Sequence, residues 1–286
     1  MSAFDYIAPG VFKKSVFGCS KPSENYRLKS FMMLIGMGGI SRGASTSIKK
    51  LETDFLMIPV QSPASPSISN VLAKFQGFSR SELDGFFFRS ITKNHKLHQN
   101  IYGELKNAIG HHAEGSPVAC FLYIYRLIEQ TALCLPMVSI ISKGGFNNTF
   151  DAFKQLVDGK AKSDLSVLKK YSENILDPAV GDSVAKLDFS RTLRPKQNVE
   201  VVKRFIVQAN IVSETIDSIE IKYRNLDALI VGFRNQFFHY LFHERNLSIT
   251  DIDSPDDFLK VCNPIFLNYF AFLYHDLVVS ELTIWG

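Results

Sequence analysis

Hydrophobic and polar positions alternate along the second half of the chain with the period of helices. From Leu226 to Glu244, in LDALIVGFRNQFFHYLFHE, apolar residues recur so that at roughly 100° per residue they form one broad stripe. A second apolar strip, made of Val231, Phe238 and Phe242, follows the same predicted helix. Two apolar faces predict two packing partners, one within the domain and one outside it.

Helix-start signals occur on both sides of this segment. Ser116 and Pro117 are typical of an N-cap and a first helical position, and the apolar helix that follows is expected to end at Pro136. Ser254 followed by Pro255 predicts another strong start. We expect Pro264 to kink or divide the last helix and residues 150–176 to be helical. We also expect Asn198 to cap a helix over Val199–Ile216, and the motif helix to begin near Ile221.

The first sixty residues lack a long helical period. Their two short apolar runs, Phe31–Met37 and Phe55–Val60, favour strands or irregular structure. The uncharged, Ser- and Pro-rich stretch Gln61–Asn70 is typical of an exposed connection. We therefore expect a mainly α fold in two parts: residues 1–65 as a smaller N-terminal module of mixed or irregular structure, and residues 66–286 as an α-helical domain.

Composition narrows the class of protein. Of 286 residues, 46% are hydrophobic and 21% charged, which is typical of a globular chain. The sequence lacks an apolar run near the roughly 20 residues of a membrane span and lacks a cleavable signal at its start, so we expect a cytoplasmic protein without membrane contact. The four cysteines form no C-x-x-C pair, which disfavours a zinc ribbon or a disulfide scaffold.

Charge is unevenly spread. Residues 205–286 hold 5 Lys and Arg against 11 Asp and Glu, a net charge of −6, so with a total of +4 residues 1–204 carry a net charge of +10. Such a basic part permits RNA binding. The segment Ala185–Asn198 gathers Lys186, Arg191, Arg194 and Lys196 around a proline, and we interpret it as a basic loop that touches a phosphate backbone or, alternatively, is merely solvated.

Polar side chains interrupt the helix of Leu226–Glu244. Burying Arg234, Asn235 and His239 in an apolar helix is costly without a compensating role. The segment from Arg234 to His239, RNQFFH, resembles the signature of the HEPN superfamily: an arginine and a histidine four to six residues apart, commonly with Asn, Asp or His directly after the arginine. The resemblance covers residues 95–286 and is specific at this motif.

The resemblance implies a fold and a chemistry. HEPN domains are small α-helical bundles that usually dimerise and join two copies of the motif into one composite, metal-independent ribonuclease site, and the second apolar strip is what such a dimer needs. It also implies that His239 transfers protons, that Arg234 binds the phosphate and that Asn235 orients either His239 or the phosphate. Tyr240 and His243 are weaker candidates.

Two further sets of residues are candidates for a site. On the helix after Pro117, Arg126 and Glu129 are expected to form an internal ion pair, the alternative being that they line the active site. His95 and His98 have a spacing that can bind zinc on a helix. Because neither a carboxylate nor a cysteine lies at ligand spacing beside them, we expect surface histidines, and no cofactor or metal.

The function expected is therefore a metal-independent endoribonuclease of HEPN type, acting as a toxin or as an antiviral or abortive-infection effector. It would cleave RNA at a composite homodimer site, and any antitoxin or sensor protein would be a separate chain. The alternative is a non-catalytic α-helical interaction or regulatory protein. In that case Arg234 and His239 are structural and are satisfied by carboxylates such as Asp227 or Glu244.

Overall fold

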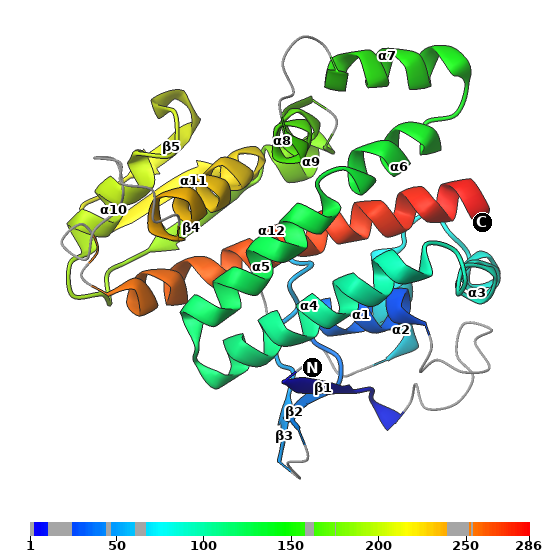
Figure 1. The fold of residues 1–286 in the computed structure, drawn as a ribbon, viewed down its shortest axis with the longest axis horizontal. Coiled ribbons are helices and arrows are strands. Elements are labelled where there is room, and N and C mark those ends of the chain that lie inside the picture. Colours follow the sequence, from blue (N-terminus) through cyan, green and yellow to red (C-terminus); the bar gives the residue numbers. More distant parts are fainter. Residues whose placement is uncertain are drawn as a thin grey trace.

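The computed structural model describes residues 3–10, 25–43, 47–60, 67–157, 163–174, 176–238, 252 and 254–286. The described part is mainly helical and carries two small antiparallel sheets (Figure 1), which confirms the predicted mainly α class. Its first half contains β1 (Phe4–Ile7), α1 (Tyr26–Leu34), β2 (Gly39–Arg42), β3 (Ile48–Lys50), α2 (Ile68–Lys74), α3 (Arg80–Arg89), α4 (His95–Glu114), α5 (Pro117–Thr131) and α6 (Cys134–Ser142). Its second half contains α7 (Phe146–Val157), α8 (Asp164–Asn174), α9 (Pro178–Gly181), β4 (Val184–Asp188), α10 (Pro195–Lys203), β5 (Ile211–Glu214), β6 (Ser218–Lys222), α11 (Leu226–Phe238) and α12 (Pro255–Trp285).

Helix α12 is the central element of the fold. It begins as predicted, because the Ser254 hydroxyl accepts a hydrogen bond from the Asp257 N–H at 3.2 Å and Pro255 occupies its first turn. Pro264 does not divide it. Most of its side chains are buried, and it packs against α1, α3, α5, α6 and α11. Figure 1 shows α4, α5 and α12 side by side, so these three helices form the layer around which the remaining elements are placed.

The N-terminal elements pack on this layer. Strands β1, β2 and β3 pair in that order, with Ile7 opposite Gly39, and β1 and β2 contact α4. Residues Phe31–Met37 were expected to be a strand or irregular, and this is wrong for the first part of that run. It lies in α1, which Asn25 caps through a bond from the Leu28 N–H at 3.0 Å. Because α1 is buried on nearly every face, its sequence shows no polar side from which a helical period could be read.

The second sheet corrects two predictions. Strand β4 falls within the segment that was expected to be a basic loop, and β6 pairs between β4 and β5. The expected helix over Val199–Ile216 is instead α10, which begins at Pro195 and ends at Lys203. A proline is favourable at the first helical position because its missing N–H is not needed there. Asn198 lies within α10 and donates to the Thr192 hydroxyl at 2.9 Å, so it is not the cap.

Two helix boundaries also differ from the prediction. Helix α5 starts at Pro117 as expected but ends at Thr131, and Pro136 lies in the first turn of α6, where a proline is tolerated. The motif helix α11 starts at Leu226, after β6, and not near Ile221. Residues 150–176 are helical in α7 and α8 as predicted, over the part that the structure describes.

One continuous set of buried hydrophobic residues runs through the described part of the chain. It includes Phe4, Phe31 and Phe55 from the first sixty residues together with residues of α4, α5, α11 and α12. The predicted boundary between residues 1–65 and 66–286 falls in 61–66, outside the described residues, and stays a prediction. Among the described helices, none is by itself both long and apolar enough to cross a membrane; only α5 and α6 taken together, bent by 44°, meet that length and composition.

Candidate functional site

Helix α11 holds the motif by burying its first apolar stripe. Leu226, Leu229, Ile230 and Phe233 are fully buried, as the periodicity predicted. The Phe233 ring stacks on Phe258 of α12, with centroids 4.9 Å apart and planes 6° from parallel. These contacts fix the rotation of α11 about its axis, and with it the direction in which the next two residues point.

Arg234 and Asn235 follow directly on this anchored turn. Arg234 is partly buried, and its guanidinium lies over the Tyr125 ring of α5, 4.8 Å from the centroid. Its Nη1 donates to Oδ1 of the exposed Asn235 at 3.1 Å. A cation over an aromatic face contributes about 0.5–2 kcal/mol depending on solvation. The charge is therefore held in one orientation near the surface by a ring and a neighbouring amide.

Tyr125 and Glu129 bring α5 into the same cluster. Burial, together with hydrogen bonding and charge from Glu129, raises the pKa of Tyr125 to about 12, although Arg234 acts in the opposite direction. Tyr125 thus stays a neutral phenol beneath the guanidinium. Tyr125 was not among the site residues predicted from the sequence, although its position one turn before Glu129 places the two on one face of a helix.

Arg126 has a different partner from the one predicted. Its Nη2 lies 2.8 Å from Oε1 of Glu104 on α4, and its guanidinium lies 5.7 Å from the centre of the Tyr123 ring. The expected internal pair with Glu129 is therefore wrong, because α4 packs on that side of α5 and offers a carboxylate. Glu129 instead interacts with Tyr125. Arg126 belongs to the α4–α5 contact and Glu129 to the cluster of Arg234.

Asp227 was the nearest predicted carboxylate for a structural Arg234. It is buried in the first turn of α11, and its charged neighbours are Lys169 and Glu173 of α8. Burial raises its pKa to about 7. Asp227 lies seven positions before Arg234, about 10 Å along a helix, and the contacts of Arg234 include Tyr125 and Asn235.

The remaining motif residues cannot be placed. His239, Tyr240, Phe242, His243 and Glu244 lie outside the described residues. The approach of His239 to Arg234 and Asn235, and the second apolar strip through Phe242, therefore stay predictions. Val231, the first member of that strip, is partly buried against the core.

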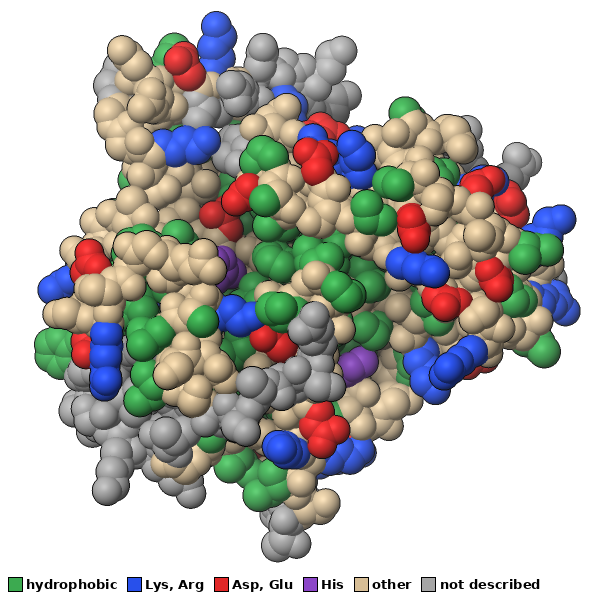
Figure 2. Space-filling view, turned by 180° about the vertical axis from the view of Figure 1, so that it is seen from behind, with side chains coloured by type: hydrophobic (Ala, Val, Ile, Leu, Met, Phe, Trp, Pro, Cys, Tyr) green, Lys and Arg blue, Asp and Glu red, His purple; other side chains and the backbone are tan. Residues whose placement is uncertain are grey.

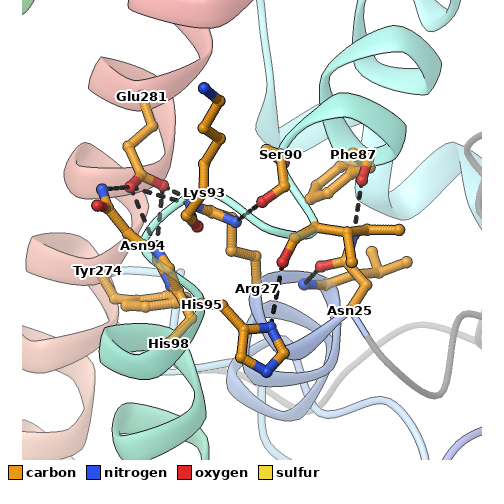
Figure 3. Close-up of polar contacts among 12 residues, drawn as sticks. Asn25, Arg27, Phe87, Ser90, Lys93, Asn94, His95, His98, Tyr274 and Glu281 are labelled. Carbon is orange, nitrogen blue, oxygen red and sulfur yellow. Dashed lines mark hydrogen bonds and ion pairs between the residues drawn. The ribbon is translucent and has the colours of Figure 1, made fainter.

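A second polar cluster lies buried between α1, α4 and α12. Figure 3 shows Arg27, His98 and Glu281 pointing toward one another. Arg27 Nε lies 2.6 Å from Oε2 of Glu281, and its terminal nitrogens donate to the carbonyls of Ser90 and Lys93. Asn94 donates to Oε1 of Glu281 at 2.9 Å. Every hydrogen-bonding edge of the Arg27 guanidinium and of the carboxylate thus faces a polar group.

His98 completes this buried cluster and corrects a prediction. It is 1% exposed, so it is not a surface histidine. Its Nε2 lies 3.1 Å from Oε2 of Glu281 and its Nδ1 lies 3.0 Å from the Tyr274 hydroxyl. One neutral tautomer satisfies both, with Nε2–H donating to the carboxylate and Nδ1 accepting from the phenol. The sequence could not reveal this because the carboxylate is 183 residues away.

Burial and charge fix the protonation of the buried cluster. Burial lowers the pKa of His98 despite Glu281, so the imidazole is neutral at pH 7. Burial by itself would raise the pKa of Glu281, but hydrogen bonds from His98 and Arg27 and the charge of Arg27 outweigh it and hold that pKa at about 2. The cluster is thus one ion pair with a neutral imidazole. Since Arg27, His98 and Glu281 are each at most 2% exposed, a substrate does not reach it in the folded protein.

Two cavities of about 470 and 480 Å³ lie elsewhere. One lies between β3 and α4 beside His112, and the other lies between α2 and α12 beside His275. Figure 2 shows hydrophobic side chains in the hollowed middle of one face, with charged side chains around them. Neither cavity is lined by a residue of α11. Within the described residues, three or more His, Cys, Asp or Glu are nowhere grouped so that they could hold a metal ion.

Comparison with known proteins gives no match for this chain among family models, curated proteins or solved structures.

Proposed function

We propose that this chain is a metal-independent endoribonuclease of HEPN type. The observation that supports the proposal best is the position of Arg234, which is held over Tyr125 at the end of α11 and hydrogen-bonded to an exposed Asn235. Asp227, one of the carboxylates expected to satisfy a structural Arg234, has its charged neighbours on α8 instead. A planar guanidinium near the surface is suited to bind two oxygens of a phosphate.

The proposed reaction divides the work among three residues. A neutral His239 accepts the proton of the ribose 2′-OH, whose oxygen attacks the neighbouring phosphorus. The 5′-oxygen leaves with a proton from a protonated His239, and the product carries a 2′,3′-cyclic phosphate. A reference pKa of about 6.5 lets both forms of histidine exist near neutral pH. Arg234 stabilises the charge that develops on the phosphate, and Asn235 orients Arg234 through its Oδ1.

The composite site requires two copies of the motif. We propose a homodimer through Val231, Phe238 and Phe242, and a cellular role as a toxin or as an antiviral or abortive-infection effector with a separate antitoxin or sensor. Light scattering at micromolar concentration should give the mass of two chains. Phe242→Asp should weaken the dimer because it buries an unpaired charge, and a dimer that survives this change has its interface elsewhere.

The decisive experiment measures cleavage and melting on the same variants. Arg234→Ala and His239→Ala should each lower the cleavage rate by about two orders of magnitude or more, while leaving the melting temperature unchanged or slightly raised. Arg126→Ala is the matched control, since it removes an arginine from the neighbouring helix and breaks the pair with Glu104. It should retain wild-type cleavage.

Two results would reject the proposal. If the wild type cleaves no RNA and the Arg234 and His239 variants melt at lower temperature, the residues are structural and the chain is a non-catalytic helical interaction protein. Cleavage should also persist in EDTA. Loss of cleavage on chelation that a divalent ion restores would refute the metal-independent chemistry.

A further inference from the structure

The positive charge of the chain is concentrated in one segment near α11. Residues 184–204, which comprise β4, the loop after it and α10, are called here the basic arm. They carry 6 Lys and Arg against 2 Asp and Glu, a net charge of +4 that equals that of the whole chain. All 21 of these residues are described, and Lys186, Arg191, Arg194 and Lys196 are exposed.

Nearby carboxylates neutralise only part of the basic arm. Lys203 lies 3.2 Å from both Glu200 and Glu214, so those charges offset one another. Lys186 stands opposite Glu220 in the sheet. Asp188 accepts the Ser190 N–H at 3.0 Å, and its charged neighbours are Lys186 and Arg191 of the arm itself.

Arg191, Arg194 and Lys196 are exposed and lie close together in the sequence, in the loop after β4 and the first turn of α10. Among its contacts Arg194 has the neutral amide of Gln197, at 3.4 Å. Residues 189–197, at the end of the loop and the start of α10, hold these three cations and neither Asp nor Glu, so they present net positive charge on both sides of Leu193, which is 78% exposed.

Local hydrogen bonds hold this loop in shape. The Thr192 hydroxyl donates to the Phe189 carbonyl at 2.7 Å and accepts from Asn198 Nδ2 at 2.9 Å. These bonds tie the loop to α10 at its far end. The cations are thus presented from a structured turn, so less conformational entropy is lost when they bind a ligand.

A column of aromatic rings connects the basic arm to the candidate site. The Phe189 ring stacks on Phe258, with centroids 5.2 Å apart, and Phe258 stacks on Phe233 at 4.9 Å. Phe233 immediately precedes Arg234. Figure 1 shows β4, α10 and α11 together at one end of the molecule, away from α3. The loop cations and the Arg234 guanidinium are therefore parts of one packed unit.

We infer that the basic arm binds the phosphate backbone of the RNA strand that is cleaved at Arg234, with Arg191, Arg194 and Lys196 as the contacts. This inference rests on the proposed ribonuclease function. Three cations on a structured turn can pair with successive phosphates, and Leu193 between them offers apolar surface to an unstacked base. Contacts of this kind position the strand without reading its sequence.

The test measures binding separately from cleavage. The probe is a fluorescent 2′-O-methyl RNA oligonucleotide, which lacks the 2′-OH that the proposed reaction needs. Anisotropy titrations over a range of salt give the slope of log K against log salt, to which each phosphate contact on a single strand contributes about 0.7. The variant Arg191→Ala/Arg194→Ala/Lys196→Ala should lower that slope by about 2. The matched control, Arg80→Ala/Lys93→Ala/Lys96→Ala, removes three exposed cations near α3 and should bind as the wild type does.

The outcomes separate this inference from the proposed function. An unchanged slope in the arm variant, or a wild type that does not bind the probe at low salt, overturns the inference even if RNA is cleaved. A wild type that binds the probe through the arm but cleaves no RNA rejects the nuclease and keeps the binding surface. Co-flotation with vesicles of phosphatidylglycerol, without binding to the probe, would assign the basic arm to an anionic lipid surface and would also overturn the inference.

Discussion

Replacing Glu281 by Gln tests how the buried cluster between α1, α4 and α12 stabilises the fold. The change keeps the shape of the side chain and removes its charge. Arg27 then stays buried beside a neutral amide, the carbonyls of Ser90 and Lys93 and the Trp285 ring, none of which carries a negative charge. Removing one member of a buried ion pair costs about 3–5 kcal/mol because the remaining charge lacks compensation. In a chain of this size that corresponds to a fall in melting temperature on the order of 10 °C.

The pH dependence gives a second and independent readout. Glu281 stays ionised in the folded state down to its pKa of about 2, whereas in the unfolded chain it takes up a proton near 4.5. Its stabilising contribution is therefore complete above pH 4.5 and is lost as the pH falls toward 2. The difference in melting temperature between wild type and Glu281→Gln should be constant from pH 8 to 5 and should shrink below that.

Thermal melts followed by circular dichroism measure both effects, with Glu173→Gln as the control. That exposed glutamate lies 3.9 Å from Lys169 one turn away, and surface pairs of this kind contribute at most about 1 kcal/mol. The double variant Arg27→Met/Glu281→Leu should recover part of the loss, since it removes both charges. Recovery stays incomplete because the Ser90 and Lys93 carbonyls lose their donor. If Glu281→Gln costs no more than Glu173→Gln, the cluster does not stabilise the fold as argued.

Three further predictions concern α11 and its neighbours. Asp227→Asn should become more stable relative to wild type as the pH rises, by at most about 4 kcal/mol above pH 7. The reason is that the Asp227 carboxyl has a pKa of about 7 in the folded protein and 3.8 in the unfolded chain, so its ionisation destabilises the fold. A difference in melting temperature that is the same at pH 4 and pH 8 would contradict this. Gly232→Ala should cost about 1–3 kcal/mol in urea unfolding, because an added Cβ would lie within 3.0 Å of the Phe205 ring. Gly103→Ala on α4, where a Cβ meets nothing within 4 Å, should be neutral or stabilising. Tyr125→Leu should lower the rate of RNA cleavage about 2- to 30-fold by removing the ring beneath Arg234, whereas Tyr125→Phe should cleave at the wild-type rate. Equal cleavage rates for the two variants would show that the ring does not position the guanidinium.

Local signals in the sequence predicted the starts of the long helices and the buried face of α11. A serine followed by a proline marks the starts of α5 and α12, because both residues act within the first turn of the helix. The apolar stripe of α11 can be recognised in the sequence because polar residues occupy other positions of that helix. Helix α1 lacked that contrast, since even Arg27 and Ser30 are buried there. Strand β4 is five residues long, too short for its alternation to outweigh a nearby proline.

The polar clusters depend on tertiary contacts that the sequence does not encode locally. Arg234 and Asn235 were predicted as site residues from the motif, but the ring beneath the arginine comes from α5, and nothing within the motif points to Tyr125. From the sequence of its own helix, Arg126 was expected to pair with Glu129, and His98 was expected to be a surface histidine. In both cases another helix supplies the carboxylate, Glu104 for Arg126 and Glu281 for His98.

The ion pair between Arg27 and Glu281 also determines when α1 can pack during translation. The two residues are 254 positions apart, and at 5–20 residues per second a ribosome needs roughly 13–50 s to add the second after the first. Throughout that interval α1 has no neutralising carboxylate from α12, and a bare guanidinium is too costly to bury. The apolar side chains of α1 are therefore exposed to solvent or bound by a chaperone until α12 has been synthesised. We expect the N-terminal elements to pack onto the helical layer only at the end of translation.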